Sequence, residues 1–233
     1  MKERPILFSA PMVIARREGK KTQTRRIINP QPIWVADPSV PFKTTDADPM
    51  GIINCPYGKP GDLLYIKEAA WMWCEKKPNG TTKTGKQKWL YEPLREAPVV
   101  YCADHPDKPQ VNIAHEKTGN EWGWRKKIGR FLPRWASRTT LEIVSVRVER
   151  LRDISDADAI AEGLRVCPNM NGRAGLRGYV WPDSPYDKNG LCHSLPVTAF
   201  GQGWEIINGQ GSWDLNPWVW VIEFKRVNNG FSE

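Results

Sequence analysis

The chain has 233 residues, with 34 Lys and Arg against 26 Asp and Glu and a formal net charge of +8. This length fits one large or two small domains, and a hydrophobic share of 40% excludes a disordered chain. The sequence contains no run of 18 apolar residues, which excludes a transmembrane helix, and no fixed repeat, which argues against a solenoid.

The predicted elements begin with short strands and helices in alternation. Pro11 suits a first helical position and Gly19 suits a helix stop, so the first helix is expected near 11–18. In chain order the full series is a strand at 6–9, that helix, strands at 22–28, 63–68 and 139–150, helices at 156–162 and 197–207, and a closing strand at 218–225.

The strand at 139–150 changes phase along its length. Leu141 and Ile143 share one parity, whereas Val144, Val146 and Val148 share the other. Since strand side chains alternate between two faces, this phase change indicates a β-bulge between the two sets.

The short helix at 156–162 has recognisable boundaries. It begins at a segment similar to a capping box, 155–158, and stops at Gly163, so it ends on Glu162. A carboxylate at a helix C-terminus opposes the helix dipole. This conflict indicates a functional role for Glu162, and a solvated helix end is the alternative interpretation.

The remaining segments, 74–124 and 166–196, are polar and rich in Gly and Pro, and we interpret them as loop-rich insertions. Strands separated by helices of uneven length favour an α+β fold, with a small β-barrel flanked by short helices. We therefore expect a single domain over residues 1–233 that carries these two insertions.

The five cysteines, at 55, 74, 102, 167 and 192, are odd in number and widely spaced. This pattern argues against a disulfide framework and favours a reduced, cytoplasmic protein. The N-terminus faintly resembles a secretion signal, but Pro11 interrupts its apolar run and basic residues follow at once.

A metal site has little support in the sequence. Cys102, His105 and His115 have a spacing similar to part of a zinc site, and His193 is the available fourth ligand. No convincing spacing links the four. We therefore expect no metal and no other cofactor.

Positive charge is concentrated in two segments. Residues 1–30 hold eight Lys and Arg with two Glu, and residues 125–138 hold six with no acid. Such segments on a mildly acidic body indicate a local anion site, most commonly for nucleic acid; a solvated basic surface is the alternative. Four aromatic residues interleave the second segment: Trp122, Trp124, Phe131 and Trp135. Rings among cations suit base stacking beside phosphate contacts.

The densest polar cluster spans residues 19–26 and reads Gly-Lys-Lys-Thr-Gln-Thr-Arg-Arg. A basic turn that enters a strand after Gly presents backbone N–H groups, ammonium groups and hydroxyls together, which suits an anionic or carbonyl-bearing ligand. The spacing is not that of a P-loop. In a regular strand Lys21 and Thr24 face opposite ways, so they meet only if Lys21 belongs to the turn.

Residues 15–26 resemble the helix–Gly-x-Lys-Thr-x-Thr/Glu-x-Arg loop of the ASCH domain, a branch of the PUA-like superfamily of β-barrels. Other segments are similar to that family in the same order: 61–64, 138–151, 154–164 and 218–227. The phrases at 133–138 and 208–213 resemble ASCH-domain proteins of tailed phages and prophages. The resemblance implies a PUA-like barrel in the cytoplasm of a bacterial host cell.

The resemblance also implies a pocket for a nucleobase or nucleic acid. The smallest bacterial members of the family are amidohydrolases that deacetylate N4-acetylcytidine with a Lys, a Thr and a Glu, which fall here on Lys21, Thr24 and Glu162. The lysine would activate the threonine hydroxyl for attack on the amide carbonyl, and the glutamate would protonate the leaving amine. Glu68 is the reserve carboxylate.

We expect RNA, DNA or a modified nucleoside as the partner, and no membrane. Recognition of a base is the first hypothesis; an amidohydrolase acting on an N4-acylated cytosine, a metal-independent ribonuclease and a structural role in the virion are the alternatives. The expected binding residues, besides the three catalytic candidates, are Gly19, Lys20, Thr22, Arg25, Arg26, Arg134, Trp135 and Arg138.

Overall fold

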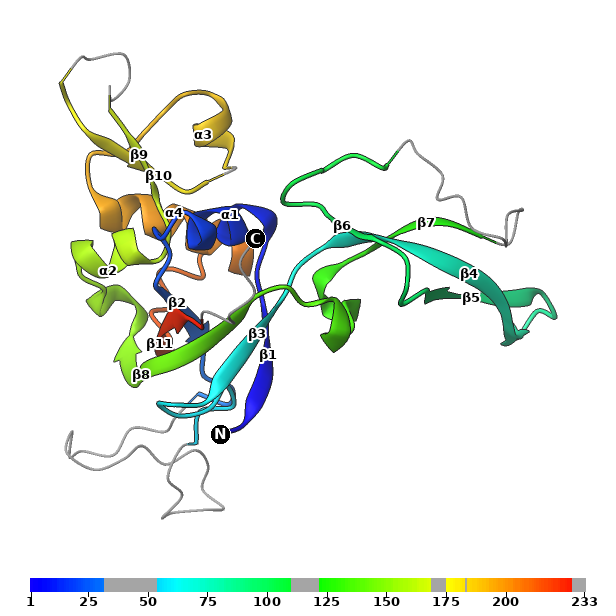
Figure 1. The fold of residues 1–233 in the computed structure, drawn as a ribbon. Coiled ribbons are helices and arrows are strands. Elements are labelled where there is room, and N and C mark those ends of the chain that lie inside the picture. The colour runs from blue at the N-terminus through cyan, green and yellow to red at the C-terminus, as the bar shows by residue number, and fades with distance from the viewer. Residues whose placement is uncertain (32–53, 110–121, 169–174, 183, 228–233) are drawn as a thin grey trace. The chain divides into compact units, whose positions relative to one another are not determined.

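The computed structural model describes residues 1–31, 54–109, 122–168, 175–182 and 184–227 (Figure 1). The chain separates into two compact units. The first unit comprises Met1–Pro5, Ile14–Leu64 and Thr139–Glu233, and the second comprises Ile6–Val13 and Tyr65–Arg138. Within the described ranges no helix has both the length and the apolar character needed to cross a membrane.

The regular elements follow the predicted order in the segments where strands and helices were expected. They are β1 (Glu3–Leu7), α1 (Ala10–Arg17), β2 (Gln23–Ile27), β3 (Leu63–Lys67), β4 (Ala70–Thr81), β5 (Gln87–Pro93), β6 (Val99–Tyr101), β7 (Trp122–Lys127), β8 (Thr140–Arg150), α2 (Asp156–Ala161), β9 (Arg165–Cys167), β10 (Gly178–Val180), α3 (Pro185–Lys188), α4 (Pro196–Asn208) and β11 (Trp218–Arg226).

A five-stranded sheet has the order β1-β3-β8-β11-β2. Its strand β11 pairs antiparallel with both β8 and β2, and Val219, Val221 and Ile222 of β11 are completely buried. The predicted bulge is confirmed: Glu223 pairs with Ser145 and Phe224 with Ile143, which leaves the intervening residue of β8 unpaired. That extra residue is what reverses the parity of the strand.

The α+β class is confirmed, but the described strands do not form a closed barrel. The sheet order leaves β1 and β2 at its two edges. Closure of a barrel depends on strand tilt and register stagger. Neither quantity is encoded in the hydrophobic pattern that predicted the strands.

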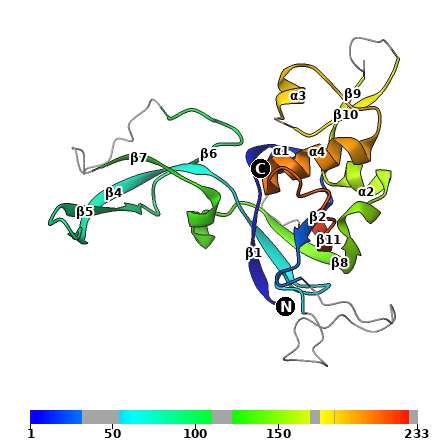
Figure 2. The same ribbon diagram turned by 180° about the vertical axis from the view of Figure 1, so that it is seen from behind.

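A second sheet fills most of the second unit, with the order β5-β4-β6 and with β7 also paired to β4 (Figures 1 and 2). On one face Ala70, Met72 and Cys74 pack against Leu132 and Ala136. On the other face Trp73 meets Trp124 edge to face, with ring centroids 5.6 Å apart. Residues 74–109 and 122–124 of the expected first insertion therefore belong largely to this sheet and are not loop-rich.

The prediction that the cysteines form no disulfide is not met in the structure. Cys167 and Cys192 form a disulfide, whereas Cys55, Cys74 and Cys102 are free. The expectation of a fully reduced set is therefore wrong. The two partners lie 25 residues apart in the sequence. They meet because β9 pairs with β10, and because Tyr179 of β10 also pairs with His193, the residue after Cys192.

Helix α4 owes its close packing to Gly203. A Cβ atom at this position would lie 2.1 Å from Cδ2 of Trp181, whose side chain is itself buried. Gly203→Ala is therefore expected to lower the free energy of unfolding by about 1–3 kcal/mol or more, through overpacking. Urea denaturation measures this loss, and Thr198→Ala on the exposed side of the same helix is the control. A loss equal to that of the control would contradict the packing role.

Asp62 fixes the turn that leads into β3. Its carboxylate accepts hydrogen bonds from the backbone N–H of Lys2 and Lys59 and from the guanidinium of Arg4. These donors, with the Lys2 bond first, lower the pKa of Asp62 from 3.8 to about 2.

This lowered pKa makes the stability of the first unit dependent on pH. Because the folded state holds the carboxylate ionised, the contribution of Asp62 is fully present above its unfolded pKa and is lost as pH falls toward 2. The melting temperatures of the wild type and of Asp62→Asn should therefore differ at pH 6 and converge toward pH 2. An equal difference at both pH values would contradict this role.

Candidate functional site

Lys21 and Glu162 form a buried ion pair although 141 residues separate them in the sequence. The Lys21 side chain is fully buried, and Glu162 is 3% exposed. Nζ of Lys21 donates to Oε2 of Glu162 at 2.9 Å, to the Glu162 carbonyl at 2.8 Å and to the Gln23 carbonyl at 2.9 Å. Three acceptors match the three N–H donors of an ammonium group.

The backbone holds this pair in place from both partners. Gly19, in a left-handed conformation, ends α1, and a bridge then pairs Lys21 with Glu162. Ser155 caps the start of α2 by accepting from the N–H of Asp158, and Glu162 is the residue that caps its end, where the sequence predicted the helix to stop. Gly163 follows with a φ of 100°, and a Cβ there would lie 3.1 Å from Cβ of Lys21. The glycine therefore permits the close approach.

The electrostatics of Lys21 combine two opposed effects. Burial lowers the pKa of Lys21, and the neighbouring Glu162 carboxylate opposes that shift. Arg25 and Arg26 add to the lowering by charge repulsion. An ammonium with a lowered pKa releases its proton more readily than a surface lysine, which is the property required for proton transfer.

Arg25 lies in the same buried network. Its Nη2 contacts Glu149 and Asp158, each at 3.0 Å, and its Nη1 lies 3.6 Å from Oε1 of Glu162. Arg147 completes the network through ion pairs with Glu149, Asp158 and Glu223. Arg25 was one of the expected binding residues, and its guanidinium is held by carboxylates of the protein.

Three atoms of this network lack hydrogen bonds among the described residues, and all three are shielded from solvent. They are Nε and Nη1 of Arg25 and Oε1 of Glu162. Such atoms are costly to leave unsatisfied. Because Nη1 of Arg25 and Oε1 of Glu162 lie 3.6 Å apart, one polar atom of a water molecule or a ligand placed beside both would satisfy them.

Thr24 is 2% exposed and pairs with Ile222 in the sheet. The neighbouring side chains of Gln23 and Arg25 both reach Asp158 on α2. Because successive strand side chains point to opposite faces, Thr24 projects from the other face of β2. The structure thus brings together Lys21 and Glu162 of the predicted triad. The third member, Thr24, is directed away from α2.

The other predicted residues of this segment lie closer to the surface. Gly19, Lys20 and Thr22 are exposed, and Lys20 pairs with Glu18 at 2.6 Å. Arg26 is half-buried and lies opposite Trp220 in the sheet. The first basic segment therefore offers much less available positive charge than its sequence implies.

The second basic segment lies in the other unit. Arg138 makes a bidentate ion pair with Glu68, at 2.9 and 3.0 Å, and also pairs with Asp104. Glu68, the reserve carboxylate, is 2% exposed and is held by this arginine. Trp135 packs against the core of the unit, and Arg134 is exposed.

The contacts between cations and aromatic rings in this unit were not predicted from the sequence. Several cations lie over aromatic rings at distances of 3.9–5.9 Å to the ring centroid: Lys76 over Trp89, Arg95 over Trp135, Arg125 over Tyr91, Lys126 over Trp71, Arg134 over Tyr65 and Arg138 over Tyr101. The β-sheet creates three of these pairs, Lys76–Trp89, Arg125–Tyr91 and Lys126–Trp71, by placing residues from different strands side by side. Interleaved aromatic residues were the available signal, but the partners depend on strand register.

The candidate metal ligands do not assemble in the part of the chain that the structure describes. No group of three or more His, Cys, Asp and Glu there has a geometry that would hold a metal ion. Cys192 is in the disulfide and Cys102 is buried. His115 lies outside the described residues.

Comparisons with known proteins add no relative to this picture. No protein-family model matches the chain, and neither a curated protein nor a solved structure does.

Proposed function

We propose that this protein binds single-stranded nucleic acid through its second unit. The observation that carries the proposal is the distribution of charge between the units. Residues 65–138 hold 15 Lys and Arg against 8 Asp and Glu, and residues 6–13 hold none, so the second unit carries +7 of the chain's +8.

The state of these cations supports the proposal. In the first unit Arg4, Lys21 and Arg25 are committed to ion pairs with carboxylates of the protein. In the second unit Lys126 and Arg134 are exposed and lie over aromatic rings. Cations provide phosphate contacts, and rings beside them provide stacking platforms for unpaired bases. Duplex nucleic acid does not expose its base faces for such stacking.

Salt dependence of binding tests this function. Fluorescence anisotropy with a labelled 15-nucleotide RNA should show a log–log slope of about −0.7 for each phosphate contacted. The same strand as DNA and as a duplex provides the comparison, and the duplex should bind more weakly. Salt-independent binding, or no binding to any of the three, would contradict the proposal.

We also propose that the first unit is an ASCH-type, PUA-like domain. Its support is the order of α1, the turn at Gly19 and β2, the start of β3 directly after Asp62, and the position of α2 as the next α-helix after β8. In this view the base pocket implied by the family lies beside Lys21 and Glu162.

A second candidate function is amide hydrolysis of an N4-acylated cytosine, and the pairing of Lys21 with Glu162 favours it. Hydrolysis breaks the C–N bond of the amide with water and yields a carboxylate and the free amine. In this reaction the Glu162 carboxylate would take a proton from the attacking water and pass it to the leaving amine, and Nη1 of Arg25, which lacks a hydrogen-bond partner among the described residues, would donate to the carbonyl oxygen. Thr24 would act as the nucleophile only if the substrate reached the opposite face of β2.

Mass spectrometry after incubation with N4-acetylcytidine tests this candidate. If the protein is this hydrolase, the wild type should release cytidine and Glu162→Gln should not. Glu18→Gln is the control, because it makes the same change at an exposed glutamate directly after α1. Thr24→Val reports on the nucleophile, since it replaces the hydroxyl by a methyl group. Cleavage of a labelled RNA in EDTA would instead identify a metal-independent ribonuclease.

A further inference from the structure

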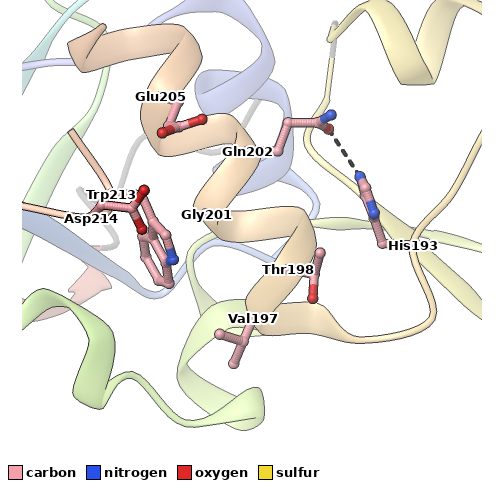
Figure 3. Close-up of a pocket in the computed structure, with 8 residues that line it drawn as sticks. All are labelled: His193, Val197, Thr198, Gly201, Gln202, Glu205, Trp213 and Asp214. Carbon is pink, nitrogen blue, oxygen red and sulfur yellow. Dashed lines mark hydrogen bonds between the residues drawn. The ribbon is translucent and has the colours of Figure 1, made fainter. Parts of the chain in front are cut away.

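A cavity of about 410 Å³ lies over helix α4 in the first unit (Figure 3). Its walls are five residues of α4 together with His193, Trp213 and Asp214. None of these residues belongs to the network of Lys21 and Glu162. The volume is in the range of small-molecule sites in proteins.

The indole of Trp213 forms a fixed wall of this cavity. It packs on Gly201, where a Cβ atom would lie 3.1 Å from the ring, and it meets Phe200 edge to face at 6.0 Å. The carboxylate of Glu205 accepts from the N–H of Gly211 at 2.9 Å, which ties the loop carrying Trp213 to α4. These contacts therefore hold the indole in place in the absence of a ligand.

The opposite wall is fixed as well. His193 exchanges two backbone hydrogen bonds with Tyr179, at 2.7 and 2.8 Å, and its ring contacts Oε1 of Gln202 at 3.2 Å (Figure 3). The adjacent Cys192 is joined to Cys167. A preformed site loses less entropy on binding than a flexible one.

The cavity is acidic although the chain is basic. Glu205 and Asp214 contribute two carboxylates, and none of the lining residues is Lys or Arg. Among the described residues, Asp214 and Oε2 of Glu205 accept no hydrogen bond. This charge repels phosphate, so the site differs from the nucleic-acid surface that we propose for the second unit.

We propose that this cavity binds a guanidinium group, carried by a small molecule or by an arginine side chain. A guanidinium is planar, permanently charged and weakly hydrated, and its N–H donors form a fork that matches carboxylates. Its plane also stacks on an indole. Carboxylates beside Trp213 meet all of these requirements. An ammonium ion, in contrast, has no plane that could stack on the indole, and an uncharged base is not attracted by two negative charges.

Calorimetric titration with agmatine tests this inference in the full chain. Agmatine should bind at least tenfold more tightly than putrescine, which carries an ammonium in place of the guanidinium. Cytidine and cytidine 5′-monophosphate should bind more weakly still. A capped arginine peptide added as a further ligand identifies the source: tighter binding than agmatine indicates a protein partner, and weaker binding indicates a small molecule.

The variant Asp214→Asn should weaken agmatine binding at least tenfold. Because Asp214 is exposed and makes no hydrogen bond to the described residues, this change leaves the fold intact, as a melting curve verifies. Asp156→Asn, an exposed acid at the start of α2, is the charge-matched control. Equal binding of agmatine and putrescine, tighter binding of cytidine, or no change in Asp214→Asn would each overturn the inference.

Discussion

The substitution Glu162→Gln is expected to lower the free energy of unfolding by about 3–5 kcal/mol. The change preserves the size of the side chain but leaves the ammonium of Lys21 buried without its counter-charge. Removing one member of a buried pair costs far more than removing both. The double variant Lys21→Met/Glu162→Gln should therefore recover much of the loss, since Arg25 keeps its contacts with Glu149 and Asp158.

Urea denaturation of the wild type, of Lys21→Met, of Glu162→Gln and of the double variant measures the effect. The neighbouring pair of Lys20 and Glu18 provides a matched control, because both of its side chains are about half exposed at 52% and 47%. Exposed pairs contribute about 0.2–1 kcal/mol, so Glu18→Gln should change stability little. If Glu162→Gln cost no more than Glu18→Gln, the buried pair would not hold α2 to β2.

Removal of three exposed cations from the second unit should weaken nucleic-acid binding and flatten its salt dependence. The triple variant Lys126→Ala/Arg130→Ala/Arg134→Ala removes side chains that are all exposed. If each contacts one phosphate, the log–log slope for single-stranded RNA should decrease in magnitude by about 2.

The control for this experiment changes the same net charge in the first unit. Arg17, Arg152 and Lys188 are likewise exposed, and their triple alanine variant should retain the wild-type slope. Equal losses in the two triple variants would mean that net charge alone attracts the nucleic acid. That result would contradict a surface specific to the second unit.

The sequence predicted the local structure of the candidate site well. Signals within a few residues of one another were sufficient for the turn at Gly19, the cap at Ser155 and the bulge in β8. The meeting of Lys21 with Glu162 was expected only through the resemblance to the ASCH domain. Nothing in the local pattern joins two residues 141 positions apart.

Features that depend on long-range pairing were not predicted. The polar segment after residue 74 gave little hydrophobic alternation, yet it forms much of the sheet of β4, β5 and β6 because the tryptophans of β4 and β7 pack together. The commitment of Arg25 to Glu149 and Asp158 depends on strand register and on the position of α2. The disulfide likewise required the hairpin of β9 and β10.

The ion pairs also explain why charge counted along the sequence was misleading. Residues 1–30 and 125–138 carry equal net charge. In the first segment, however, Lys21 and Arg25 are neutralised by carboxylates inside the protein. In the second segment Arg138 is held by two carboxylates, Glu68 and Asp104, whereas Lys126 and Arg130 are exposed. This contrast is the reason why we propose the second unit as the anion-binding surface.

Cross-linking tests this central claim most directly. A single-stranded RNA carrying 4-thiouridine, irradiated with the intact protein and followed by peptide mass spectrometry, reports which residues lie against the bases. We predict cross-links within residues 65–138, at peptides that contain Tyr65, Trp71 or Tyr91, the rings under exposed or half-buried cations. Cross-links confined to residues 139–227 would contradict the account.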